Sequence, residues 1–155
     1  MTSSALLAPL SGRFIGAAHH FAVRIYYEDT DLSGIVYHAN YLRYMERARS
    51  DMLRLAGIDQ RAGVEDGTGA YAVTDLHIKY RAPARLDDEL VVTSSVETIR
   101  GASCVIHQTI RRGDTVLTEA TVTAALLDPA GRPRRQPKPW IAAFEAIKSG
   151  NAPSP

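Results

Sequence analysis

The sequence predicts a single α+β domain in which a five-stranded antiparallel sheet wraps around one long helix. A chain of 155 residues is the size of one domain and can bury a core without disulfide bonds. One long amphipathic segment lies in its first half. Strand-forming runs separated by short turns lie on both sides of that segment, which is typical of a helix packed on one face of an antiparallel sheet.

The first strand is expected over residues 21–27, where β-branched and aromatic residues alternate with others, and turn-forming residues follow at 29–34. A helix should begin near residues 38–40 and end at about Ala56, with Gly57 just beyond it. The residues of its predicted apolar face recur at helical spacing, and they are Tyr41, Met45, Ala48, Met52 and Leu55. The opposite, charged face carries Arg43, Glu46, Arg47, Asp51 and Arg54, with Arg47 and Asp51 placed as an i,i+4 ion pair.

A polar, glycine-containing loop is expected at residues 59–69. Four more strands should follow, over residues 71–80, 89–99, 103–111 and 115–127. Their short joints predict an antiparallel meander. The flanking segments are expected to be a flexible extension at residues 1–20 and a basic tail at 131–155, with a possible short helix, so that the domain itself covers 21–130.

Composition excludes several function classes. The net charge is +1, so no global charge favours a nucleic-acid or membrane-surface partner. No secretory signal pattern and no apolar run of membrane-spanning length is present, which predicts a cytoplasmic protein without a membrane span. Cys104 is the one cysteine and is interpreted as a buried thiol, and the histidines show no metal-ligand spacing.

The acidic turn before the long helix is the candidate site. Asp31 lies a few residues ahead of the predicted helix start, where the first backbone N–H groups have no partner within the helix. A carboxylate beside such donors suits hydrolysis of an acyl group, because one part attacks or activates water and the other stabilises the oxyanion. Without further information Asp31 could also be a plain turn residue, and Asp29 is its local competitor.

Two segments resemble a known family. Residues 26–49 read YYEDTD-x-x-G-x-VYHANY-x-x-YMERAR, and residues 80–88 read YRAPARLDD. Both resemble the 4-hydroxybenzoyl-CoA thioesterase-like branch of the hotdog superfamily, and most closely its bacterial subgroup of acyl-CoA thioesterases associated with the Tol-Pal gene cluster. The resemblance covers about residues 21–130 and implies a hotdog fold, a homodimer or homotetramer, and hydrolysis of acyl-CoA to a free acid and coenzyme A.

The resemblance also implies site residues. It assigns the catalytic carboxylate to Asp31, the active-site histidine to His38 and an accessory tyrosine to Tyr27, with substrate bound at Val36, Tyr37 and His38. The backbone N–H at His38 is expected to polarise the thioester carbonyl. No metal and no cofactor are implied, because coenzyme A is part of the substrate.

Several alternatives stay open. Asp31 can act as a nucleophile or as a general base. The fold can also serve a non-enzymatic scaffold that binds acyl-CoA or acyl carrier protein, or a dehydratase. Glu46 is a rival carboxylate on the central helix, interpreted as a solvated or subunit-contact charge. A basic run can be solvated or can contact the phosphates of coenzyme A, and it consists of Arg132, Arg134, Arg135 and Lys138.

Overall fold

The computed structural model describes residues 7–153 and contains one antiparallel sheet of six strands in the order β1-β2-β4-β5-β6-β3. The expectation of five strands is corrected by β1, a short strand added at one edge. The strands are β1 Arg13–Ile15, β2 Ala18–Arg24, β3 Ala70–Tyr80, β4 Glu89–Ile99, β5 Ser103–Arg112 and β6 Thr115–Leu127.

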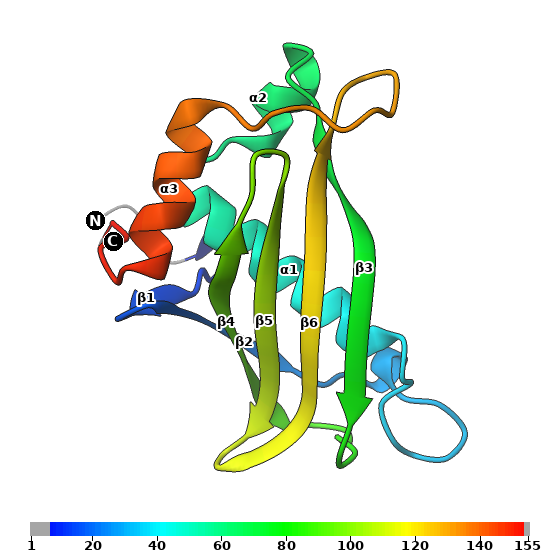
Figure 1. Ribbon diagram of the computed structural model, residues 1–155. Helices are drawn as coiled ribbons and strands as arrows, with labels where there is room; N and C mark the ends of the chain where they lie inside the picture. Colours follow the sequence, from blue (N-terminus) through cyan, green and yellow to red (C-terminus); the bar gives the residue numbers. More distant parts are fainter. Residues whose placement is uncertain (1–6, 154–155) are drawn as a thin grey trace.

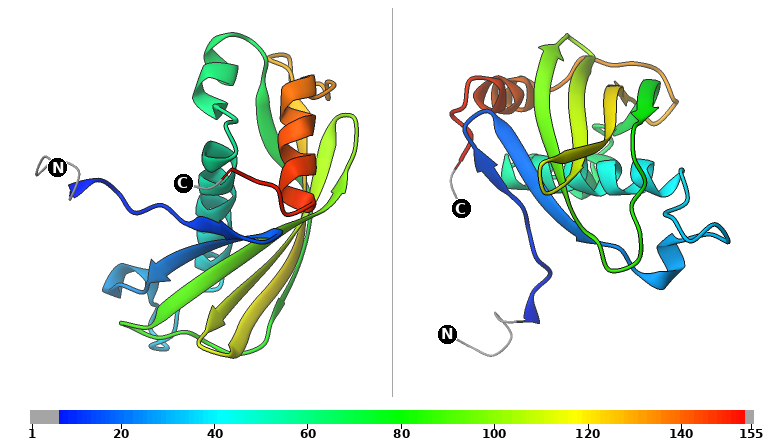
Figure 2. Two further views of the ribbon diagram at one scale, coloured as in Figure 1. Left: turned by 90° about the vertical axis from the view of Figure 1, so that its left-hand side faces the viewer. Right: turned by 90° about the horizontal axis from the view of Figure 1, so that it is seen from below.

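The long helix α1, Asn40–Leu55, crosses the sheet diagonally on its concave side (Figure 1). Figure 2 shows the sheet curving around this helix. Two shorter helices are α2, Gln60–Glu65, and α3, Lys138–Lys148. The predicted α+β architecture is therefore confirmed. The short helix α2 replaces part of the loop expected at 59–69, because the Asp59 side chain accepts a hydrogen bond from the Ala62 N–H and caps it.

The strand order differs from a simple meander. β4, β5 and β6 are consecutive neighbours as predicted, but β3 pairs with β6 and β2 pairs with β4. The segment joining β3 to β4 therefore crosses the ends of two strands. Eight residues reach up to about 26 Å, whereas three strand spacings need only about 14 Å. The meander expected from short joints is therefore wrong for β3 and β4, because a joint of this length permits a crossing.

The N-terminal segment is more ordered than the sequence suggested. Residues 13–20 were expected in a flexible extension, but they form β1 and the start of β2, joined by a turn at Gly16 with φ of 61°. Residues 1–6 of that extension lie outside the described part. The other end of β2 also differs, since it stops at Arg24 and residues Tyr27–Asp29 form a 3₁₀ turn. The predicted strand over 21–27 is thus shifted toward the N-terminus.

The core lies between α1 and the sheet. Four residues of the predicted apolar face, Tyr41, Met45, Ala48 and Met52, are buried. The fifth, Leu55, is only half-buried, and Leu53 is buried in its place. Each large buried side chain contributes about 1.5–3 kcal/mol, so this stripe is what attaches the helix to the sheet.

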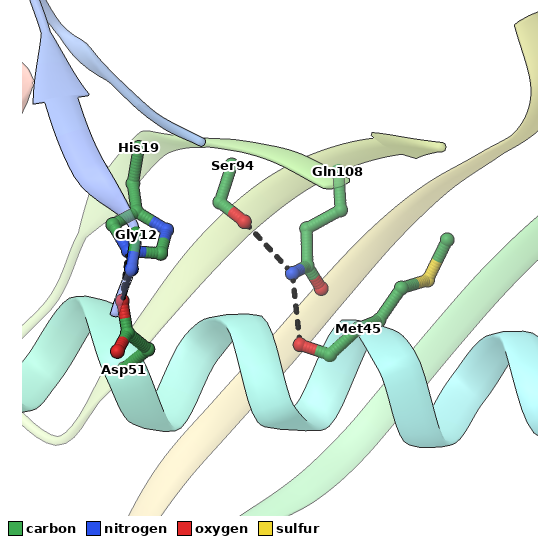
Figure 3. A network of polar contacts seen from close by, with 6 residues as sticks. All are labelled: Gly12, His19, Met45, Asp51, Ser94 and Gln108. Carbon is green, nitrogen blue, oxygen red and sulfur yellow. Dashed lines mark hydrogen bonds and ion pairs between the residues drawn. The ribbon is translucent and has the colours of Figure 1, made fainter. Parts of the chain in front are cut away.

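Asp51 was expected on the charged face, but it is buried against β2 (Figure 3). Its Oδ2 atom lies 2.7 Å from Nε2 of His19 and accepts the N–H of Gly12 at 2.9 Å. Burial lowers the pKa of His19, which favours the neutral imidazole. These bonds tie α1 to β2 and to the residue just before β1, and they replace the predicted contact between Asp51 and Arg47.

A second buried polar contact joins β5 to α1 (Figure 3). Gln108 Nε2 donates to the carbonyl oxygen of Met45 at 3.0 Å and to Oγ of Ser94 at 2.9 Å. Its Oε1 accepts a hydrogen bond of 2.9 Å from Nη1 of Arg49. A buried amide with donors and acceptor satisfied holds the helix in one register over the sheet.

The C-terminal segment packs on the domain, in contrast to the expected tail. Gln136 is buried and accepts from the hydroxyl of Tyr71 at 2.5 Å while donating to the carbonyl of Arg100 at 2.8 Å. Arg134 donates to the carbonyl of Thr68 at 2.8 Å. Helix α3 follows and covers one end of the sheet beside β4 (Figure 1), with Phe144 among its buried side chains. Residues 154–155 lie outside the described part.

Candidate active site

The segment between β2 and α1 is a tight loop closed by a bridge between Thr30 and Val36. Within it the Asp31 N–H donates to the Ile35 carbonyl at 3.0 Å, and the Gly34 N–H donates to the Asp31 carbonyl at 3.0 Å. Gly34 has φ of 80°, a value that a residue with a Cβ rarely adopts. The predicted turn therefore fixes the backbone of Asp31 in one conformation.

The Asp31 carboxylate is exposed and faces solvent. Oδ1 accepts the Ser33 N–H at 2.8 Å and also the Ser33 hydroxyl. These bonds from the Ser33 side chain and backbone lower the pKa of Asp31, and the nearby His38 lowers it further. The group is thus an ionised carboxylate at neutral pH, with one oxygen engaged by Ser33.

The start of α1 leaves backbone donors available. Asn40 is buried and its Nδ2 donates to the Asp29 carbonyl at 2.8 Å, which anchors the first turn. Tyr37 donates its own N–H to the same carbonyl at 2.9 Å. Between them, among residues 7–153, the N–H groups of His38 and Ala39 make no hydrogen bond. Free N–H groups at a helix start suit an oxyanion.

A hollow of about 300 Å³ lies beside these donors, and it is lined mainly by apolar side chains. The predicted residues Val36 and His38 line it, whereas Asp31 and Tyr37 do not. The residues of this active-site hollow are Ile35, Val36, His38, Tyr41, Tyr80, Arg81, Ala82 and Pro83. It has the size and character of the smaller ligand pockets in proteins.

The structure does not bring every predicted site residue together. Tyr27 lies in the 3₁₀ turn with its side chain 84% exposed, and its ring contacts no other aromatic ring in the described chain. Tyr37 is exposed and its ring lies 4.6 Å from that of His38. Asp29, the local competitor of Asp31, accepts the Tyr26 N–H at 2.8 Å and so has a structural role.

Tyr80, at the end of β3, was not predicted in the site. Its hydroxyl donates to the His38 carbonyl at 2.8 Å, and its ring lies 5.6 Å from Tyr41. It therefore fixes the peptide that follows the free His38 N–H. The only signal in the sequence is that Tyr80 begins the second segment of the family resemblance, which says nothing of its distance from His38.

Three further observations concern the described part of the chain. Within residues 7–153 no three His, Cys, Asp or Glu side chains are grouped so that they could hold a metal ion. Cys104 is buried, and burial raises its pKa to about 11, so its thiol is not an activated nucleophile. No helix in the described chain is long and apolar enough to cross a membrane.

Comparison with known proteins agrees with this arrangement. A family model described as the thioesterase superfamily matches residues 33–119. The chain is 41% identical to the acyl-CoA thioesterase YbgC of Haemophilus influenzae, over 83% of this chain and 95% of that protein. It is 42% identical to the acyl-CoA thioester hydrolase YbgC of Escherichia coli O157:H7, over 79% of this chain and 92% of that protein.

A solved structure is also similar. The crystal structure of a probable thioesterase from Bartonella henselae matches with a TM-score of 0.74 and 37% identity, covering 77% of this chain and 99% of that one. The residues matched by the family model include part of the Asp31–Gly34 turn, all of α1 and three of the long strands. The chain has the hotdog fold and belongs to the thioesterase superfamily.

Proposed function

We propose that this protein hydrolyses acyl-CoA thioesters to a free acid and coenzyme A. The observation that carries the proposal is the placement of an exposed, ionised Asp31 in a rigid turn ahead of the unpaired N–H of His38. The curated relatives at 41–42% identity are acyl-CoA thioesterases, and they match most of this chain. The active-site hollow beside His38 supplies an apolar space for a substrate.

In the proposed mechanism the thioester carbonyl accepts a hydrogen bond from the His38 N–H. Asp31 then attacks the carbonyl carbon, and the thiolate of coenzyme A leaves as an acyl anhydride forms, which water hydrolyses. Alternatively Asp31 takes a proton from water, and the resulting hydroxide attacks the carbonyl carbon and displaces the coenzyme A thiolate. In both routes the negative charge that develops on the carbonyl oxygen is stabilised by the backbone donor.

The test is release of free thiol from a panel of acyl-CoA thioesters and from an acyl carrier protein loaded with the same acyl groups. A thioesterase releases thiol from at least one of them. A scaffold binds without release, and a dehydratase changes the acyl group but leaves the thioester intact. No thiol release from any substrate would contradict the proposal.

His38→Ala is expected to lower kcat less than loss of the Asp31 carboxylate does. The donor proposed here is the backbone N–H, which survives truncation of the side chain. Steady-state thiol release on both variants measures the difference. If both were equally inactive and both were folded, the side chain of His38 would have to act as an acid or base.

We further propose that the active unit is a homodimer, or a homotetramer built from such dimers, formed through β3. This strand spans 11 residues, ends the sheet, and is exposed along most of its length. Long exposed edges readily pair with another chain. Apolar side chains, Val73 and Leu76, are also exposed on this strand. A two-fold axis at its middle pairs the edge with itself, antiparallel, and extends the sheet.

Leu76→Lys is expected to shift the oligomer toward monomer, since it places like charges close to the two-fold axis. Light scattering should then give the 16.9 kDa mass of one chain, compared with at least twice that for the native protein. Val91→Lys is the matched control. Val91 and Leu76 are each 39% exposed, but Val91 lies on β4, which has a neighbouring strand on each side and is not an edge strand. A native protein that is monomeric and fully active would rule out the dimer.

A further inference from the structure

Tyr80 is the last residue of β3, and it lines the active-site hollow although it is far along the chain from the Asp31 turn. Its hydroxyl donates to the carbonyl oxygen of His38 at 2.8 Å. Its ring meets those of His38 and Tyr41 edge-on, with centroid distances of 6.2 Å and 5.6 Å. Burial raises the pKa of Tyr80, so the phenol stays protonated at neutral pH. The hydroxyl is therefore a fixed donor aimed at one backbone carbonyl.

The His38 carbonyl belongs to the same peptide group as the Ala39 N–H. A peptide group is planar and trans, so a bond that fixes the direction of the carbonyl also fixes the opposite direction of the N–H. A hydrogen bond accepted by the carbonyl also polarises the group and strengthens the next bond by about 10–30%. Tyr80 thus acts on the Ala39 N–H, because the His38 N–H belongs to the preceding peptide.

The Ala39 N–H makes no hydrogen bond within the described part of the chain. On one side the Tyr37 N–H donates to the Asp29 carbonyl, and on the other the Asn40 N–H donates to the Tyr37 carbonyl. Ala39 has φ of −70° and ψ of −20°, which are helical values. Successive N–H groups at the start of a helix point the same way, so those of His38 and Ala39 can converge on one acceptor.

We propose that the Ala39 N–H is a second donor to the thioester oxyanion, and that Tyr80 is a positioning residue that aims and polarises this N–H through the His38 carbonyl. The carbonyl oxygen gains negative charge as the tetrahedral intermediate forms, so a second donor stabilises the transition state more than the bound substrate. The effect should therefore appear in kcat and not in KM. This inference rests on the proposed thioesterase function and deepens its mechanism.

Tyr80→Phe removes only the hydroxyl and keeps the ring. It should lower kcat by about threefold to tenfold, with KM unchanged. Tyr71→Phe is the matched control and should keep the native kcat. Tyr71 lies near the other end of the same strand, and its hydroxyl also donates a hydrogen bond, to Gln136, outside the lining of the active-site hollow. Light scattering checks that both variants keep the native oligomer. A native kcat in Tyr80→Phe would overturn the proposal.

A vibrational measurement separates positioning from simple packing. The probe is the acyl-CoA of the thiol-release panel with the highest kcat/KM, labelled with ¹³C at the thioester carbonyl and bound to Asp31→Asn protein. A hydrogen bond to that carbonyl weakens its double bond, so binding should shift its infrared band to lower frequency. Adding Tyr80→Phe should reverse part of the shift, whereas adding Tyr71→Phe should not. A lower kcat with an unchanged band would show that Tyr80 only packs against the loop, and would overturn its positioning role.

The Ala39 N–H can be removed directly. Its φ of −70° is within the range of proline and it has no protein partner to lose, so Ala39→Pro deletes the donor. Loss of one oxyanion donor should lower kcat by about 10²–10³. Proline also restricts His38 before it, so a second variant carries lactic acid at position 39, which replaces the N–H by an ester oxygen and keeps the methyl group. Native kcat in this ester variant would overturn the second donor.

Combining the changes shows whether Tyr80 acts through Ala39. In the ester variant, Tyr80→Phe should cause little further loss of kcat, because the N–H that it polarises is already gone. Equal losses in the native and ester proteins would contradict the proposal. No thiol release by the native protein from any substrate would instead reject the proposed function, whereas native thiol release that the ester leaves unchanged would reject only the second donor.

Discussion

Replacing Asp31 with asparagine is expected to lower kcat for thioester hydrolysis by a factor of about 10²–10⁴. Asparagine keeps the size of the side chain and can still accept the bond from Ser33, so the turn should persist. It cannot serve as the proposed base, and it is a poor nucleophile. Steady-state thiol release gives the effect on rate, and circular dichroism checks the fold.

Glu28→Gln is the matched control for this variant. Glu28 lies three residues before Asp31 and is exposed. Its replacement by glutamine also removes one carboxylate of the acidic turn. We expect its activity to stay near that of the native protein. If Asp31→Asn retained activity within about tenfold of native, a loss of only about 1.4 kcal/mol, Asp31 would have to be removed from the mechanism.

Asp51→Ala is expected to lower the free energy of unfolding by about 3–5 kcal/mol. The carboxylate is buried, and its loss leaves the His19 imidazole and the Gly12 N–H without their partner. Such a loss is a large part of the about 5–15 kcal/mol that stabilises a typical domain. Urea unfolding measures it through the change in midpoint.

Two further variants distinguish the loss of the buried polar pair from the destabilisation caused by the cavity that alanine creates. Asp51→Leu combined with His19→Phe replaces both side chains by apolar groups and should restore much of the lost stability, because the imidazole is no longer left unpaired and only the Gly12 N–H lacks its partner. Glu65→Ala removes one partner of the exposed Arg61–Glu65 pair and should change stability by less than about 0.5 kcal/mol. Equal effects of Asp51→Ala and Glu65→Ala would show that the buried pair is not a structural anchor.

Local patterns determined much of this protein. The bounds of β4 and β6 agree with those expected from residue alternation, and α1 spans Asn40–Leu55 as its apolar spacing predicted. Both patterns are local, because side chains repeat every two residues on a strand and every 3.6 on a helix. The turn at Gly34 and the placement of Asp31 before the helix also follow from residues adjacent in the chain.

Contacts between distant segments had no such local signal. His19 and Asp51 are 32 positions apart, and each was assigned to a solvent-exposed segment from its own surroundings. Tyr80 and His38 are 42 positions apart, so nothing near either residue indicates their hydrogen bond. The strand order, in which β3 pairs with β6 and not with β4, likewise depends on how the whole sheet curves around α1.

The sequence by itself therefore determined the fold class, the long helix, the acidic turn and the family. The tertiary structure alone decided the sixth strand, the order of the sheet, the buried His19–Asp51 pair and the hydrogen bond from Tyr80 to His38. Periodicity and turn chemistry act over a few residues and can be read along the chain. Strand pairing and the burial of polar groups depend on which segments meet in space, and that is fixed only when the chain closes loops of many residues around a common core.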